Sequence, residues 1–284
     1  MRTHSIRRRL AAAAVAAAST ALLAVPGASP ANATDPLTMV ALGDSSAAGP
    51  LVGSQSSWDC LRSTSNWPAV AARTIGAQLT DVTCSGATTA DITAKRYGYI
   101  PAQVDAVQPD TDIVTLAIGA NDINLGGTVP SCMQPLPYPA GVSCKSWMTA
   151  NGDPTDAQLA AVAPKVAADI QAIRAKAPAA QIYLVGYLRY WDATGCYPID
   201  PIWDVDAQWL QTIFDRTNAM LRTTATANGA TYVDIATPST GHGVCAPLAS
   251  KWVEGFIPTS QAAPYHPNQM GMDAAGAVVA SAIG

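Results

Sequence analysis

Four short segments of the chain carry residue types that could perform nucleophilic chemistry. A serine hydroxyl such as that of Ser45 is a poor nucleophile at its ordinary pKa and needs a base within hydrogen-bonding distance. Ser45 lies in a turn of small residues after an apolar run, so we expect it near the amino end of a helix, where backbone N–H groups favour negative charge. Ser45 is therefore a candidate nucleophile, although the segment by itself is also consistent with a plain glycine-serine turn. The four segments are Gly43-Asp44-Ser45-Ser46, Cys84-Ser85-Gly86, Gly119-Ala120-Asn121-Asp122 and Tyr265-His266-Pro267-Asn268.

Histidine is scarce, which narrows the choice of base. After residue 33 the chain contains only His242 and His266. His242 lies in a glycine turn beside a cysteine, and we interpret it as structural. Pro267 favours the first turn of a helix, which places His266 on the preceding loop rather than in the core. His266 is the candidate base that would take a proton from the nucleophile and return it to the leaving alcohol.

A negatively charged tetrahedral intermediate needs fixed hydrogen-bond donors, and one such donor typically contributes about 2.7–4 kcal/mol. Gly86 can point its backbone N–H at a ligand because no side chain stands in the way. Asn121 follows the strongest apolar run and could donate its side-chain amide, or simply cap the next turn. Neither Gly86 nor Asn121 by itself establishes a site that binds the intermediate.

The four segments taken together, in this order, resemble the SGNH hydrolases, also called GDSL-type lipases and esterases. The chain is most similar to the secreted actinomycete branch with three disulfides. The resemblance runs from Gly43 to Gly271 and implies a flavodoxin-like α/β/α fold with five central parallel strands. It implies Ser45 as the nucleophile and His266 as the base. It also implies an oxyanion hole formed by the backbone N–H groups of Ser45 and Gly86 and by the side chain of Asn121.

The third member of a catalytic triad is missing from its usual place. Many members of the family carry an acid three residues before the histidine, where this chain has Ala263. Some secreted actinomycete relatives use a main-chain carbonyl instead, so we expect the carbonyl of Ala263 or a neighbour to orient His266. A neutral carbonyl can fix the tautomer, although it stabilises imidazolium less than a carboxylate does. Asp234 and Asp273 are the alternatives, acting as remote acids.

Short apolar runs alternate with helical patterns along the chain. This alternation predicts one three-layer α/β domain with a parallel sheet. Two proline-rich segments, 121–153 and 188–203, are predicted as long loops at the carboxyl ends of strands, where open α/β sheets build their sites. The predicted strands are 38–42, 77–84, 112–118, 181–185 and 231–235, and the predicted helices are 66–75, 157–176, 206–228 and 267–282.

The first 33 residues have the features of a secretion signal. Arginines are concentrated at the start, residues 10–25 are uncharged, and Ala31-Asn32-Ala33 provides a cleavage site. The apolar stretch is short for a membrane span. We expect cleavage after Ala33, a secreted catalytic domain of residues 34–284, and no integral membrane segment. The run Arg7-Arg8-Arg9 leaves open whether export uses the Sec or the twin-arginine route.

Removing the signal changes the charge of the protein. The whole chain has a formal net charge of −4, and without the four signal arginines the mature part has 12 basic and 20 acidic residues, a net charge of −8. Such a surface does not attract nucleic acid or anionic membranes through bulk charge. We expect an ester or lipid substrate, no nucleic-acid partner and a monomeric protein.

All six cysteines lie in the mature part. An even number in an exported chain predicts three disulfides, and the spacings typical of zinc sites are absent. No metal or organic cofactor is expected. Sequence order leaves several pairings open, of which the simplest is sequential. A bridge at Cys84 would lie two residues before Gly86 and could hold the oxyanion turn. The sequential pairs are Cys60–Cys84, Cys132–Cys144 and Cys196–Cys245.

These observations predict a secreted serine esterase or lipase that cleaves carboxylic esters of lipids or short acyl esters through an acyl-enzyme. One alternative is a carbohydrate or polymer acyl-esterase. A second is a secreted peptidase, which would cleave amides. A third is a non-catalytic binding domain on the same fold, since fold does not fix function. A degenerate member should have lost one of the four site residues, and this chain retains all four.

Overall fold

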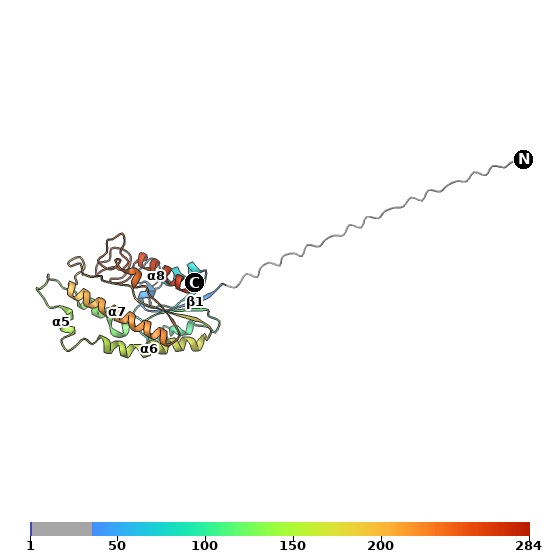
Figure 1. Ribbon diagram of the computed structural model, residues 1–284, viewed down its shortest axis with the longest axis horizontal. Coiled ribbons are helices and arrows are strands. Elements are labelled where there is room, and N and C mark those ends of the chain that lie inside the picture. The colour runs from blue at the N-terminus through green and yellow to red at the C-terminus, as the bar shows by residue number, and fades with distance from the viewer. Residues whose placement is uncertain (2–35) are drawn as a thin grey trace. The chain divides into compact units, whose positions relative to one another are not determined.

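Five parallel strands form the central sheet of this computed structural model, which describes residue 1 and residues 36–284 (Figure 1). The predicted cleavage site after Ala33 lies outside the described residues. The strand order is β4-β1-β5-β6-β7, which is the flavodoxin-like doubly wound order. The predicted α/β fold with five parallel strands is confirmed. The strands are β1 (Thr38–Gly43), β4 (Gln78–Asp81), β5 (Ile113–Ala117), β6 (Gln181–Val185) and β7 (Thr231–Val233).

The two central strands lie deepest in the core. Every residue of β5 is buried, as are five of the six residues of β1. The two strands pair in parallel from Met39 opposite Ile113 to Gly43 opposite Ala117. Strands buried on both faces need apolar side chains on both, which is why their sequences show a continuous apolar run rather than alternation.

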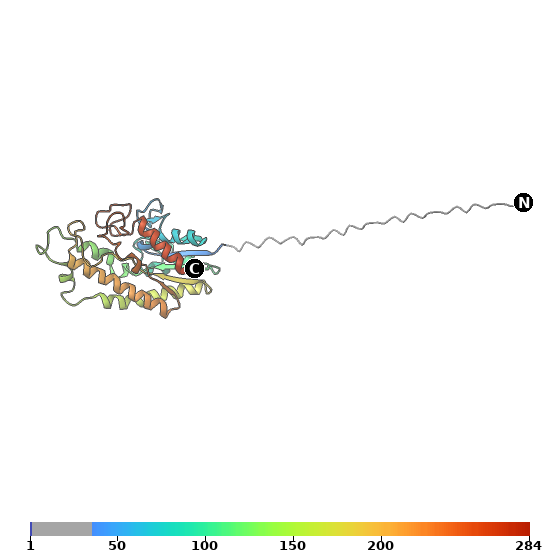
Figure 2. The same ribbon diagram turned by 45° about the horizontal axis from the view of Figure 1, so that its top comes forward.

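Helices cover both faces of the sheet (Figures 1 and 2). α2 (Trp67–Ile75) packs against α8 (Gln269–Ile283) in one layer, and α6 (Thr155–Lys176) packs against α7 (Asp204–Ala227) in the other. All four lie within a few residues of the helices predicted from the sequence. Among residues 36–284, none of these helices is both long enough and apolar enough to cross a membrane.

The helix ends follow their sequence signals. Asn66 caps α2 by accepting a hydrogen bond from the Ala69 N–H, and Gly76 ends the helix with a φ of +70°. Asn268 caps α8 in the same way, accepting from the Gly271 N–H. α6 extends to both sides of Pro164, so this residue neither ends the helix nor sets its start.

Several short elements were not predicted. The segment 121–153 was expected to be a loop, but it contains α4 (Leu125–Ser131) and α5 (Cys144–Met148). Helices of one or two turns are too short to show a periodic pattern in the sequence. The other short elements are α1 (Ser45–Ala48), α3 (Ala90–Thr93), the antiparallel pair β2 (Gln55–Ser57) and β3 (Arg62–Ser63), and 3-10 turns at 103–106, 121–123 and 237–239.

Three disulfides cross-link the loops, as predicted. They join Cys60 to Cys84, Cys132 to Cys144, and Cys196 to Cys245. Each bridge therefore connects cysteines that are neighbours in sequence order. The first fastens the loop after β4 to the segment before β3, and the third fastens the segment after β6 to the loop before α8.

Candidate active site

Ser45 stands at the carboxyl end of β1, as the first residue of α1. A Cβ on Gly43 would lie 2.5 Å from the carbonyl oxygen of Ala117, so only glycine lets β1 approach β5 this closely before the turn. Asp44 caps α1, and its carboxylate accepts hydrogen bonds from the Ser46 N–H at 2.8 Å and the Ser46 hydroxyl at 2.7 Å. The Ser45 side chain is left half-buried and free to face the pocket.

His266 lies directly beside Ser45. Its Nε2 is 2.8 Å from the Ser45 Oγ, and its Nδ1 is 2.8 Å from the carbonyl oxygen of Pro264. A carbonyl only accepts, so this contact assigns the proton to Nδ1 and leaves the lone pair of Nε2 for the serine hydroxyl. A neutral histidine in this tautomer can act as a general base.

The carbonyl that orients the histidine belongs to Pro264, so of the two choices expected from the sequence, Ala263 or a neighbour, it is the neighbour that contacts the ring. The Ala263 carbonyl instead accepts the backbone N–H of His266 at 3.2 Å. The reason lies in Tyr265, whose φ of +56° turns the chain back so that the carbonyl two residues upstream meets the ring. A non-glycine residue in this left-handed region costs about 1–2 kcal/mol, so the surroundings must hold it there.

Neither remote acid contacts His266. Asp234 binds the Arg222 guanidinium at 3.0 Å, and Asp273 accepts the side-chain amide of Gln269 at 2.8 Å. The second histidine has structural surroundings. The ring of His242 stacks on Trp252 with the centroids 4.0 Å apart.

Asn121 follows β5 and lines the same pocket as Ser45 and His266. Its side-chain nitrogen donates to the Ala87 carbonyl at 2.9 Å, which uses one of the two amide hydrogens. The second hydrogen remains for another acceptor.

Gly86 lies on the neighbouring loop, with a φ of +77°, and is exposed rather than part of the pocket lining. Ala87 links this loop to Asn121 through the hydrogen bond just described. Among residues 36–284, the backbone N–H groups of Ser45 and Gly86 have no hydrogen-bond acceptor. The structure thus places two unused backbone donors and a side-chain amide around the end of the sheet where Ser45 lies.

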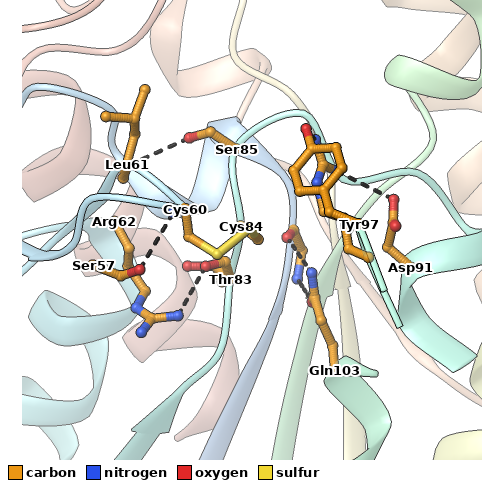
Figure 3. The surroundings of a disulfide bond; sticks show 12 residues. Ser57, Cys60, Leu61, Arg62, Thr83, Cys84, Ser85, Asp91, Tyr97 and Gln103 are labelled. Atoms are coloured by element: carbon orange, nitrogen blue, oxygen red, sulfur yellow. Dashed lines mark hydrogen bonds and ion pairs between the residues drawn. A yellow bond between two sulfur atoms is a disulfide. The ribbon is translucent and has the colours of Figure 1, made fainter. Parts of the chain in front are cut away.

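The Cys60–Cys84 disulfide holds one side of the Gly86 loop (Figure 3). The Ser85 N–H donates to the Cys60 carbonyl at 2.8 Å, next to this bridge. Arg62 donates to the Thr83 carbonyl at 3.1 Å on the other side of Cys84. These contacts fix the residues on both sides of the bridge.

Arg96 and Asp91 hold the other side of the loop. Their ion pair spans 3.2 Å, and Asp91 also accepts the Thr88 N–H at 2.7 Å. A Cβ on Gly86 would lie 2.7 Å from the Arg96 Nη2, so the guanidinium occupies the space that any larger residue would need. The guanidinium is the movable end of a side chain, so the positive φ is the stronger reason for a glycine at this position.

The pocket at these residues has a volume of about 290 Å³. Ser45, Asn121 and His266 form its polar end, while aromatic and aliphatic side chains form its walls. The rings of Tyr190 and Phe214 stack with their centroids 4.0 Å apart. The apolar lining includes Leu125, Val129, Pro130, Tyr190, Phe214 and Phe256.

A buried network in the wall of the pocket joins the turn before Ser45 to the turn before Asn121, and no sequence pattern predicts it. The Tyr187 hydroxyl donates to Asp44 at 2.7 Å and accepts the Ala120 N–H at 3.0 Å. Burial raises the pKa of Asp44 to about 6, although hydrogen bonds from Tyr187 and Ser46 oppose this effect. The network ties the turn before Ser45 to the residue that precedes Asn121.

Burial also lowers the pKa of His266 below its ordinary value, and the hydrogen bond to Pro264 partly opposes this effect. The imidazole is therefore neutral near pH 7, as a general base must be. Among residues 36–284, no three histidine, cysteine, aspartate or glutamate side chains are grouped so that they could hold a metal ion. The groups present can perform nucleophilic attack with general-base assistance.

Comparisons with known proteins give the family and the fold that this chain resembles. The model of the GDSL-like lipase and acylhydrolase family matches residues 41–274. Lipase 2 of Streptomyces coelicolor is 37% identical over 277 residues, which covers 93% of this chain and 93% of that protein. The crystal structure of an extracellular lipase from Streptomyces rimosus superposes with a TM-score of 0.71 and 27% identity, covering 87% of this chain and 99% of that chain. Phospholipase A1 from Streptomyces albidoflavus gives the same TM-score and coverage with 25% identity.

Proposed function

The chain belongs to the GDSL-like lipase and acylhydrolase family, and we propose that it hydrolyses carboxylic esters through an acyl-enzyme formed on Ser45, with His266 as the base. The observation that carries the proposal is the pair of contacts on the imidazole. Nε2 lies 2.8 Å from the Ser45 Oγ while Nδ1 is held by the Pro264 carbonyl. A serine with a correctly oriented base is the minimum set for acyl transfer.

The reaction proceeds in two halves. The Ser45 Oγ attacks the ester carbonyl carbon as its proton passes to Nε2 of His266. The tetrahedral intermediate then collapses, the imidazolium gives the proton to the departing alcohol, and the acyl group remains on Ser45. In the second half, water attacks the acyl carbon, His266 accepts the water proton and returns it to Ser45 Oγ, and the carboxylic acid leaves.

The proposed oxyanion hole consists of the backbone N–H groups of Ser45 and Gly86 and the side chain of Asn121. Free backbone donors at Ser45 and Gly86 and the second amide hydrogen of Asn121 support this assignment. Removing one such donor typically costs about 2.7–4 kcal/mol of transition-state stabilisation.

The apolar walls of the pocket support an apolar acyl chain as the group transferred. An apolar cavity of about 150 Å³ binds benzene, so a pocket of about 290 Å³ has room for a chain of medium length. A sugar ring would leave its hydroxyl groups against Leu125, Val129 and Phe256 without partners, which costs free energy. We therefore favour a lipid-type ester over a carbohydrate ester.

We further propose that the protein is exported, is cleaved after Ala33 and acts outside the cell as a single domain of residues 34–284. The basic and apolar start of the sequence supports export, and so do the three disulfides, which persist in oxidising compartments. All proposed catalytic groups come from one chain, which supports a monomer.

Hydrolysis of p-nitrophenyl esters from acetate to palmitate by the mature protein, with EDTA present, tests the proposed function. We expect the highest kcat/KM on chains of medium length. Ser45→Ala should abolish the activity, while Ser281→Ala, a matched change at an exposed position of α8, should leave it intact. Inert wild-type protein, or full activity in Ser45→Ala, would contradict the proposal.

A further inference from the structure

Asp200 is a buried carboxylate that the proposed mechanism does not use. It lies in the segment between β6 and α7, and only 2% of its surface is exposed. Three donors surround it: the Tyr265 hydroxyl at 2.8 Å, the Phe256 N–H at 3.3 Å and the Trp191 indole N–H at 3.3 Å. Trp191 lies in the same segment as Asp200, whereas Phe256 and Tyr265 lie in the loop before α8, so the carboxylate joins the segment after β6 to the loop that carries His266.

Tyr265 is the residue through which Asp200 could affect the site. Its φ of +56° lies in the left-handed region, which bulky residues rarely adopt without support from their surroundings. The side chain is buried, with 7% of its surface exposed, and its ring centroid lies 6.0 Å from that of Trp191. The hydroxyl reaches Asp200, so the Tyr265 side chain is anchored at both its ring and its tip.

The conformation of Tyr265 decides where the His266 ring points. The residue stands between Pro264, which supplies the orienting carbonyl, and His266 itself. The left-handed turn is what brings this carbonyl within 2.8 Å of Nδ1. In an extended conformation at Tyr265, successive carbonyls would point to opposite sides and the contact would be lost.

The rest of the His266 backbone is held separately. Its N–H donates to the Ala263 carbonyl at 3.2 Å, and its carbonyl accepts the Glu254 N–H at 3.0 Å. The first of these bonds also closes the turn from Ala263 to His266, and the Tyr265 N–H donates to the Gly255 carbonyl at 3.4 Å, so the backbone gives this turn part of its support. The Tyr265 side chain and its partner add to this support at the residue with the left-handed φ.

We propose that Asp200 is a positioning residue for His266: by holding the Tyr265 hydroxyl, it maintains the left-handed turn that sets the Pro264 carbonyl against Nδ1. The inference rests on the proposed function of His266 as the base. Asp200 thereby orients the imidazole from a distance, whereas the carboxylate of a Ser-His-Asp triad does so by direct contact. No charge is delivered to the ring, because the carbonyl remains the only partner of Nδ1 among the described residues.

The test uses Tyr265→Phe, which removes the hydroxyl and keeps the ring. We expect kcat on p-nitrophenyl butyrate to fall by about 10–100-fold, since small displacements of a catalytic group have effects of this size, with KM nearly unchanged. Asp200→Ala, which removes the acceptor of the Tyr265 hydroxyl, should act in the same direction, and it is the second variant if Tyr265→Phe fails to fold. Tyr232→Phe is the matched control, because the Tyr232 hydroxyl is buried without a hydrogen-bond partner among the described residues.

A second readout follows the imidazole directly. Nitrogen-15 NMR of the folded mature protein reports the tautomer of His266, and the mature chain contains only one other histidine, His242. The wild type and Tyr232→Phe should show the Nδ1–H tautomer at His266. Tyr265→Phe should show a mixture of the two tautomers.

An unchanged kcat in a folded Tyr265→Phe protein would overturn the proposal, as would a lower kcat with an unchanged tautomer. The proposed function fails separately, if wild-type hydrolysis does not depend on Ser45. The NMR comparison does not require turnover, so it tests the link from Asp200 to the ring in either case.

Discussion

At the scale of single residues, the protonation of His266 and Asp44 decides the pH range of the proposed reaction. Burial lowers the pKa of His266 from its ordinary value of 6.5, so the base stays neutral to a lower pH than a free histidine does. Burial raises the pKa of Asp44 to about 6, so its carboxylate begins to take up a proton in the same range. Activity should therefore fall as the pH drops below 6.5.

We predict that log kcat/KM falls on the acid side with a slope approaching two, because two groups gain protons there. Asp44→Asn removes one of them, and the slope should become one with a lower plateau. A pH profile of p-nitrophenyl butyrate hydrolysis for both proteins measures this. An acid limb centred above pH 6.5 would contradict the direction of the His266 shift.

Residue identity also decides what the sequence could and could not reveal about the site. Ser45 and His266 could be predicted because a serine nucleophile needs a base, and only two histidines follow residue 33. That the Pro264 carbonyl, rather than the Ala263 carbonyl, contacts the imidazole could not be predicted, because it depends on the left-handed backbone of Tyr265. A tyrosine gives no sign in the sequence of adopting such a conformation.

At the scale of elements, the Cys60–Cys84 disulfide should act on the Gly86 loop more than on the sheet. The pairing of β4 with β1 is set by backbone hydrogen bonds, whereas the position of the Gly86 loop depends on the bridge and a few side chains. In the double variant Cys60→Ala/Cys84→Ala we predict a loss of stability of about 2–4 kcal/mol. We also predict a fall in kcat at temperatures where far-UV circular dichroism shows the protein still folded.

The matched control is Cys132→Ala/Cys144→Ala, which removes a bridge between α4 and α5. On p-nitrophenyl acetate, whose two-carbon acyl group needs little of the apolar pocket, this variant should retain its kcat. Loss of activity in Cys60→Ala/Cys84→Ala only when the protein unfolds would show that the bridge has no effect on the oxyanion loop.

Asp169 on α6 gives a prediction about stability. It is buried close to Asp122, one of its oxygens has no hydrogen-bond partner among the described residues, and burial raises its pKa to about 8. In the unfolded chain the pKa of Asp169 is near 3.8, so the folded state holds an extra proton between these two values, and the contribution of Asp169 to stability falls as the pH rises from 4 to 8.

Asp169→Asn resembles the protonated side chain at every pH. The variant should match the wild type near pH 4 and exceed its free energy of unfolding by about 2–4 kcal/mol at pH 8.5. Urea unfolding at the two pH values measures this difference. A difference that does not change with pH would mean that Asp169 keeps an ordinary pKa.

The strands and long helices could be predicted because their signals are local. β6 (Gln181–Val185) is a buried apolar run, and α2 (Trp67–Ile75) is bounded by Asn66 and Gly76. The helix α4 was missed because it spans only seven residues and contains Gly126, Gly127 and Pro130. It forms through contacts with the rest of the fold, on which the sequence of the segment carries little information.

The network of Asp44, Tyr187 and Ala120 could not be predicted either. Asp44 and Tyr187 are 143 positions apart in the sequence. Only the order of the strands, which puts β1 between β4 and β5 and places β6 next to β5, brings them together. Contacts of this kind follow from topology, so they become visible once the sheet order is known.

At the scale of the whole molecule, the proposed export predicts a chain that is shortened at its N-terminus. We predict that the secreted form begins at Thr34, because cleavage follows Ala33 in the small-residue site. Mass spectrometry of the protein from culture medium measures this start. Medium that contains only the chain beginning at Met1, or no protein at all, would contradict the predicted signal.

The central claim is that Ser45 is the nucleophile, activated by His266. The most direct measurement is to inactivate the mature protein with a fluorophosphonate, which transfers its phosphonyl group to an activated serine and releases fluoride, and to identify the modified residue by peptide mass spectrometry. We predict a single modification on Ser45, with a labelling rate that falls sharply in His266→Ala. Inactivation with the label on any other residue, or activity that survives complete labelling of Ser45, would contradict it.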